Sequence, residues 1–186
     1  MLNEYIKEHT KEAHQSLEGK VVRQMKAIRS EADYAEVLNL FYIYFASIER
    51  AIAPFMADDV LSDYAERRNS SYIKADIESL GVQPELDPNA SVPQINNKLE
   101  ALSALYVLEG SIMGGPYIVQ MLKKYGMDKG FTFFSGYGDE SAAMWQKFVA
   151  ALNAVAESTP DNKERAAEIA NQTFARFEEL FNAKSS

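Results

Sequence analysis

The chain has 186 residues, enough for one domain with a full core, and its composition of 47% hydrophobic and 25% charged residues is typical of a globular protein. A formal net charge of -8 argues against nucleic acid or an anionic membrane as a partner. The chain has no cysteine, which excludes disulfides, thiolate metal sites and cysteine nucleophiles.

The N-terminus lacks the apolar core of a signal peptide, and no run approaches the roughly 18 apolar residues of a membrane helix. We therefore expect a cytoplasmic protein, not bound to a membrane, with a single domain over residues 1–186. The first 30 residues carry six lysines and arginines against four glutamates, a local charge of +2. An anionic ligand could bind there, although a solvated helix with mixed charges explains the same pattern.

Apolar residues at three- and four-residue spacing predict an amphipathic helix over residues 2–18, with His14 close to its apolar stripe. A second, short helix is expected over residues 21–28. Ser30 begins the sequence SEAD, a helix N-cap followed by an acid three residues on. A long helix rich in aromatic residues is therefore expected over residues 31–55.

Shorter helices are expected over residues 57–67 and 70–80, and the second is followed by Gly81. A proline-rich loop, residues 82–94, comes next. The following helix extends to about residue 125, and the glycines and aromatics of residues 126–138 indicate another loop.

A helix is expected over residues 139–156. The pair Thr159-Pro160 is typical of a cap and first turn, so we expect it to open the last helix. No segment shows the alternation of a strand. The sequence thus predicts an all-α fold of roughly seven to nine helices.

The stretch Leu105–Lys124 has the apolar content of a core helix, yet it contains Gly110, Gly114, Gly115 and Pro116. Inside a helix, glycine costs about 1 kcal/mol and proline about 3 kcal/mol relative to alanine. Such a cluster predicts a bend, or bare backbone close to a flat group. Gly110 and Gly114 are four residues apart and are predicted to share a face. The alternative is a close helix–helix crossing through small residues.

His14 is a candidate metal ligand. Glu18 lies one turn further on, where its carboxylate could accept the proton of the ring nitrogen that is not bound to metal. Lys7, two turns back, could bind an anionic group. A single imidazole beside an apolar helix face suits the iron of a haem, although a lone histidine on a helix can equally be a surface residue.

These residues resemble a known family. TKEAH, residues 10–14, followed by Leu-Glu at 17–18, resembles the proximal helix of haem oxygenases. YVLEGSIMGG, residues 106–115, resembles their distal helix, in which Gly-x-x-x-Gly-Gly bends over the haem. Residues 40–49 and 174–181 are similar to two further helices of the family. The resemblance spans most of the chain in the right order and implies a haem-oxygenase-like fold with a kinked distal helix.

The resemblance implies roles for residues on both sides of the haem. On the proximal side, His14 would be the axial iron ligand and Glu18 its hydrogen-bonding partner. Lys7 matches a residue that binds a haem propionate. Tyr44 matches one that lines the distal or propionate side.

On the distal side, the resemblance places the backbone of Gly110 and Gly114 over the haem face, leaving room for O2. Ser111 stands where many members carry aspartate, and its hydroxyl can still donate and accept a hydrogen bond to ordered water. Gly110, Ser111 and Gly114 are therefore the expected catalytic set. Pro116 stands where a residue with an N–H is common. Lys147 is a poor substitute for the family's basic propionate clamp, so the position of ring opening is not predicted.

The implied reaction opens the haem ring to biliverdin, iron and carbon monoxide, with haem as both substrate and cofactor. It uses O2 and electrons from an external donor, such as a ferredoxin, a flavodoxin or a reductase, which could dock on the basic residues between positions 7 and 29. Two alternatives stay open: a non-catalytic haem-binding or haem-transfer protein, and a haem-oxygenase-like helical protein that binds no haem.

Overall fold

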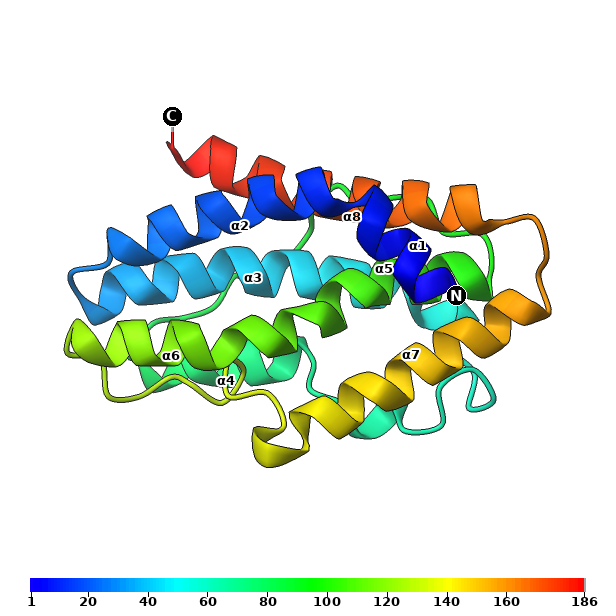
Figure 1. The fold of residues 1–186 in the computed structure, drawn as a ribbon. Coiled ribbons are helices and arrows are strands. Elements are labelled where there is room, and N and C mark those ends of the chain that lie inside the picture. Colours follow the sequence, from blue (N-terminus) through cyan, green and yellow to red (C-terminus); the bar gives the residue numbers. More distant parts are fainter. Residues whose placement is uncertain (186) are drawn as a thin grey trace.

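The computed structural model describes residues 1–185, which fold as a bundle of helices without a strand (Figure 1). The all-α prediction is confirmed. The α-helices are α1 (Leu2–His9), α2 (Lys11–Lys26), α3 (Glu31–Ile52), α4 (Ser70–Ser79), α5 (Lys98–Gly110), α6 (Gly115–Lys124), α7 (Ser141–Glu157) and α8 (Lys163–Ser185). Short 3-10 turns are η1 (Ala53–Phe55), η2 (Tyr64–Glu66), η3 (Ser111–Gly114) and η4 (Gly138–Glu140).

The N-terminal helices differ from the prediction in where the chain breaks. Thr10 has φ -111° and separates α1 from α2, and its buried hydroxyl donates to the Ile6 carbonyl at 2.7 Å. The predicted break before residue 21 is wrong. Leu17, Val21 and Met25 are all buried, so one apolar stripe continues to the end of α2.

Two other predicted boundaries are wrong for tertiary reasons. The helix expected over residues 57–67 is replaced by the 3-10 turn η2, after which the chain becomes extended at Arg67, whose side chain is buried. The last helix begins at Lys163 rather than at Pro160, because Asp161 takes a positive φ of 65° and turns the chain. By contrast, Ser30 caps α3 as predicted, accepting from the Asp33 N–H at 3.1 Å.

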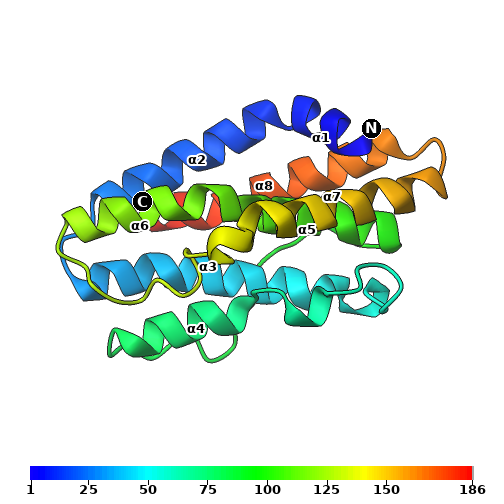
Figure 2. The same ribbon diagram turned by 60° about the horizontal axis from the view of Figure 1, so that its bottom comes forward.

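Helix α8 packs against α1, α2 and α5, and α3 packs against α4. Figure 2 shows α4 at one edge of the bundle and α1 with α2 at the opposite edge. Extensive packing between α2 and α6 is absent from the described residues. Exposed residues on these two helices include His14 and Glu18 on α2 and Pro116 and Tyr117 on α6.

The loop between α6 and α7 is part of the core, although its sequence is rich in glycine. Phe133 and Phe134 are buried and contact the ring of Phe41 on α3, at centroid distances of 6.3 and 5.3 Å. The carboxylate of Asp76 on α4 accepts from the N–H groups of Thr132 and Phe133 at 3.1 and 2.9 Å. These contacts hold the loop against α3 and α4.

Candidate functional site

The interrupted stretch consists of two helices joined by a tight turn. Helix α5 ends at Gly110, η3 takes one 3-10 turn, and α6 begins at Gly115. Pro116 lies in the first turn of α6, where its missing N–H leaves no helical hydrogen bond unmade. The predicted interruption of the distal helix is confirmed, and the proline starts a helix instead of distorting one.

The three glycines of this turn meet different surroundings. A Cβ atom at Gly115 would lie 1.9 Å from the Phe134 carbonyl oxygen, so only glycine lets the loop pass. A Cβ at Gly110 would lie 3.8 Å from the Trp145 ring, whereas one at Gly114 would meet nothing within 4 Å. A 3-10 turn separates Gly110 from Gly114 and their surroundings differ, so the shared face of these two glycines stays a prediction.

An exposed apolar surface surrounds Gly114. Met113 is 61% exposed and Tyr117 is 60% exposed, and Pro116 between them is also exposed. We call Met113, Gly114, Pro116 and Tyr117, which lie in η3 and the first turn of α6, the α6 surface. Large apolar side chains at this exposure, around a glycine that leaves open space, suit contact with a flat apolar ligand.

His14 is exposed on α2, and its ring stacks on Phe174 of α8 with centroids 5.2 Å apart and planes at 19°. Within residues 1–185, no side-chain hydrogen bond engages its ring nitrogens. His9 differs, because its Nδ1 lies 2.9 Å from the Tyr5 carbonyl oxygen. Both histidine rings therefore stack on an aromatic side chain, and they differ in that both ring nitrogens of His14 are without a hydrogen bond among the described residues. His14 as the iron ligand stays a prediction.

Glu18 and Lys7 are both exposed, near His14 in sequence. Glu18 lies one turn further along α2, but the described residues include no hydrogen bond between it and His14. Lys7 lies on α1, so the break at Thr10 separates it from the helix that carries His14. Among the described residues, neither side chain forms a hydrogen bond or an ion pair with the imidazole.

A metal at His14 would need ligands from outside the chain. In the described part of the chain, no group of three or more histidines, cysteines, aspartates or glutamates could hold a metal ion. One imidazole supplies one ligand. A chelated metal such as haem iron, which brings ring nitrogens of its own, fits this donor set.

Ser111 lies at the start of η3 in a network that the sequence did not reveal. Arg68 is buried and donates from Nη2 to the Ser111 Oγ at 2.5 Å and from Nη1 to the Phe133 carbonyl at 2.9 Å. The Ser111 hydroxyl donates to the Leu108 carbonyl at 2.6 Å. Its only proton is thus committed, so Ser111 can accept one further hydrogen bond but cannot donate one.

Glu109 is buried directly beside this turn. Its carboxylate accepts from the Tyr137 hydroxyl at 3.2 Å, and that hydroxyl accepts from the Arg68 N–H at 3.1 Å. Burial raises the pKa of Glu109, while the positive charges of Arg67 and Arg68 oppose that shift. Burial and the nearby Glu109 raise the pKa of Tyr137 to about 12, so Tyr137 stays a donor at neutral pH.

A sequence profile described as "Heme oxygenase" matches residues 1–183. The chain belongs to the haem oxygenase family. It is 32% identical over 122 residues to a "Heme oxygenase" of Xanthomonas campestris pv. campestris, covering 64% of this chain and 71% of that protein. It is 27% identical over 174 residues to "Heme oxygenase PigA" of Pseudomonas aeruginosa, covering 92% and 86%.

Solved haem oxygenases share the fold. The NO- and CO-bound heme oxygenase from Neisseria meningitidis matches with a TM-score of 0.81 and 19% identity, over 98% of this chain and 91% of that one. Heme oxygenase-1 from the cyanobacterium Synechocystis, in complex with heme, matches with a TM-score of 0.60 and 20% identity, over 98% and 91%. As a member of the family, this haem oxygenase is an oxidoreductase with haem as its cofactor.

The central stretch of this haem oxygenase also has the length of a membrane span. Within residues 1–185, the helical stretch Lys98–Lys124 is long and apolar enough by length and composition. Half of the most apolar 18-residue segment of this stretch is buried inside the structure. A core helix of a soluble protein has the same properties, so this stretch is weak evidence for a membrane helix.

Tyr44 is the predicted site residue whose place in the structure differs most from the expectation. Its side chain is fully buried, its hydroxyl donates to the Thr173 carbonyl at 2.5 Å, and its ring stacks on Phe177 at 4.6 Å. It joins α3 to α8 inside the core and has no exposed surface on which haem could rest.

We therefore expect Tyr44→Phe to lower the free energy of unfolding by about 1 kcal/mol, because one buried hydrogen bond is lost. Haemin affinity should not change. Urea denaturation and a Soret titration measure the two effects. A loss of haemin affinity at unchanged stability would show that Tyr44 is part of the haem site.

Proposed function

We propose that this haem oxygenase opens the haem ring to biliverdin and releases iron and carbon monoxide, using O2 and an external electron donor. The observation that carries the proposal is the pairing, in a member of this family, of an exposed imidazole at His14 with open backbone at Gly114. Among the described residues, helix α2, which carries His14, does not pack extensively against η3 or α6.

On the proximal side, His14 would provide the axial ligand, and Phe174 behind it would limit rotation of the imidazole. We propose Glu18 as acceptor for the other ring nitrogen once haem is bound, and Lys7 as the partner of a propionate. Bound haem supplies the iron at which O2 is reduced and the ring that is oxidised. The protein residues bind and orient the haem and control its access to water.

On the distal side, the absence of side chains at Gly110 and Gly114 would leave room for O2. The remaining lone pair of the Ser111 Oγ can accept a hydrogen bond from a water molecule. The second O–H of that water is then free to point toward the haem. Arg68 would hold Ser111 in this orientation, because its guanidinium is anchored to backbone carbonyls as well.

Ser111→Ala should reduce turnover about tenfold or more, since the oriented water loses its acceptor. Haemin affinity should change by less than about threefold. Single-turnover kinetics and a Soret titration separate the two quantities. Equal losses of turnover and affinity would contradict the assignment of Ser111 to the water.

The electron donor would dock on the basic residues of α1 and α2. Lys7, Lys11, Arg23 and Lys26 are exposed, whereas Lys20 pairs with Glu178 at 3.4 Å. An acidic ferredoxin, flavodoxin or reductase suits such a face, and its reaction rate should fall with rising salt.

We also propose that residues 1–186 form a single domain and that the protein is cytoplasmic and not membrane-bound.

The proposed function is tested by adding haemin to the purified protein and following the Soret band. We expect a shifted band, followed by its loss and by formation of biliverdin and carbon monoxide under ascorbate and O2. The absence of a shift would overturn haem binding. A band that persists, without biliverdin, would leave a non-catalytic haem-binding or haem-transfer protein.

A further inference from the structure

We propose that Arg67 is a positioning residue for the haem oxygenase reaction, which fixes the turn between α5 and α6 against α7. This inference rests on the proposed function. Arg67 itself does not touch the α6 surface or His14, and it acts through the groups that its guanidinium holds.

The guanidinium of Arg67 makes four hydrogen bonds and joins three segments. Its side chain is 1% exposed. It donates from Nε and Nη2 to the Asp63 carboxylate at 2.8 and 3.2 Å, and from Nη1 to the Glu109 Oε2 at 2.8 Å. Nη2 also donates to the Met144 carbonyl at 2.9 Å. Because the donors lie in one rigid plane, these bonds fix α5, α7 and the segment before Arg67 relative to one another.

Two of these partners lie directly beside the contact between α5 and α7. Glu109 immediately precedes Gly110, and Met144 immediately precedes Trp145. A Cβ atom at Gly110 would lie 3.8 Å from the Trp145 ring, an ordinary contact distance, so the end of α5 faces this ring with room for about one methyl group between them. Arg67 therefore sets how closely the end of α5 approaches α7, and with it where η3 begins.

The two buried arginines have separate partners around Glu109. Arg68 holds Ser111 and the Phe133 carbonyl, whereas Arg67 holds the Glu109 carboxylate and the Met144 carbonyl. Glu109 is 3% exposed and accepts only one other side-chain hydrogen bond, from Tyr137, among the described residues. Removing the cation from a buried carboxylate is costly, so the turn should shift if Arg67 is lost.

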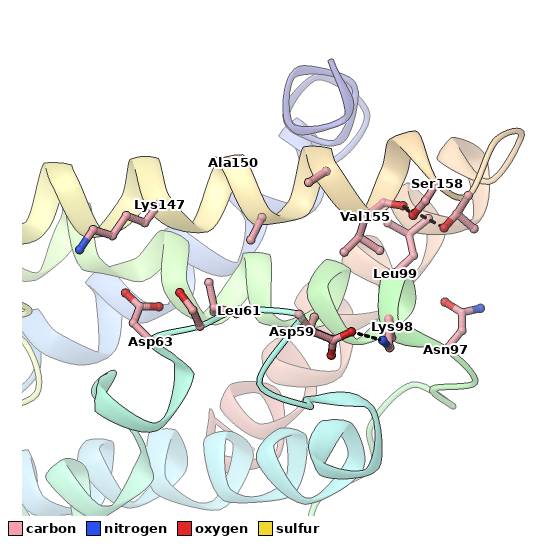
Figure 3. A pocket seen from close by; sticks show the side chains of 15 residues that line it. Asp59, Leu61, Asp63, Asn97, Lys98, Leu99, Lys147, Ala150, Val155 and Ser158 are labelled. Atoms are coloured by element: carbon pink, nitrogen blue, oxygen red, sulfur yellow. Dashed lines mark hydrogen bonds and ion pairs between the residues drawn. The ribbon is translucent and has the colours of Figure 1, made fainter.

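Asp63 is the partner of Arg67 that solvent can reach. Its side chain is 15% exposed and lines a groove of about 930 Å³ between α7 and the segment before η2 (Figure 3). Asp59 and Lys98 form an exposed ion pair at 3.1 Å in the same groove. A substitution of Asp63 therefore changes a partner of Arg67 at the edge of the structure, whereas the hydrogen bond between Arg67 and Glu109 is enclosed by protein.

The test compares Arg67→Met and Arg67→Lys with Arg165→Met as the matched control. Arg165 donates to Glu100 at 3.0 Å, and Glu100 is a buried carboxylate at the opposite end of α5. The control thus removes an arginine anchor of the same helix away from the turn. Haemin affinity, turnover and Tm are measured, together with fluorescence of the single tryptophan, Trp145, in haem-free protein.

We expect Arg67→Met to lower turnover about tenfold or more, because small misplacements of a site carry large rate costs. Haemin affinity should stay within about threefold of wild type, and Trp145 emission should shift in the haem-free protein. Arg67→Lys should recover part of the turnover, since an ammonium retains the charge but cannot make all four bonds. Arg165→Met should lower Tm without changing turnover or emission.

Wild-type turnover in Arg67→Met, or a similar loss in Arg165→Met, would overturn the proposal. If Arg67→Met does not fold, Arg67→Lys and Asp63→Asn are measured in its place. Full turnover and unshifted Trp145 emission in both variants would also overturn the proposal. Failure of the wild-type protein to bind or cleave haem would overturn the proposed function instead. The Trp145 emission of the haem-free variants would still show whether Arg67 holds the turn.

Discussion

His14→Ala is expected to abolish axial ligation and to reduce ring opening by about a hundredfold or more, a larger effect than is usual for losing a group that only supports a ligand. The reason is that His14 is the one protein ligand that we assign to the iron. The measurement is a Soret titration with haemin, followed by single-turnover kinetics. The fold should be retained, because the His14 ring lies on the surface against Phe174.

His9→Ala is the matched control for this prediction. His9 is also exposed and also stacks on an aromatic ring, that of Tyr5 at 3.9 Å, but its Nδ1 is engaged with a carbonyl. It should bind haemin as the wild type does. Added imidazole should restore part of the Soret band to His14→Ala but not alter His9→Ala. Equal spectra for the two variants would exclude His14 as the ligand.

Gly114 and Gly115 are expected to give opposite results although they are adjacent. Gly114 has φ -86° and ψ -14°, which any residue can adopt, and a side chain there would enter open space. Gly114→Leu should therefore fold normally and weaken haemin binding about tenfold or more, because leucine would occupy the space over the α6 surface. Soret titration and thermal unfolding give the two values.

Gly115→Ala should instead destabilise the protein by about 3 kcal/mol, because its methyl group would overlap the Phe134 carbonyl and displace the loop from the core. Urea unfolding of the haem-free protein measures this loss. Unchanged haemin affinity in Gly114→Leu would remove Gly114 from the haem site. Unchanged stability in Gly115→Ala would show that the loop yields at little cost.

The features that were predicted correctly are properties of the local backbone. Ser30 caps α3 because its side-chain oxygen accepts from the backbone N–H of Asp33, three residues further on. The helix is interrupted at residues 110–116 because glycine and proline do not favour a continuous helix. Whether Gly110 and Gly114 share a face was not predictable in this way, because it depends on whether the residues between them form α or 3-10 turns. The close passage of the Phe134 carbonyl at Gly115 was equally beyond the local pattern.

The features that were missed depend on partners distant in sequence. Arg67 and Arg68 lie at the end of a segment in which only a short helix, residues 57–67, was expected, but their partners lie about 40 or more residues further on, at Glu109, Ser111 and Met144. Tyr44 has the pattern of a site residue, but its hydroxyl meets Thr173, 129 residues away. No local pattern specifies such contacts.

By itself, the sequence determined that this protein is all-α, that its central helix is interrupted by glycines, and that His14 is a candidate ligand in a chain resembling haem oxygenases. The tertiary structure alone decided which glycine faces open space, that Ser111 keeps a lone pair but no free proton, and that two buried arginines form hydrogen bonds around the turn. The physical reason is range: helix propensity and breaking act within a few residues, whereas burial and hydrogen bonding of side chains depend on which helices meet.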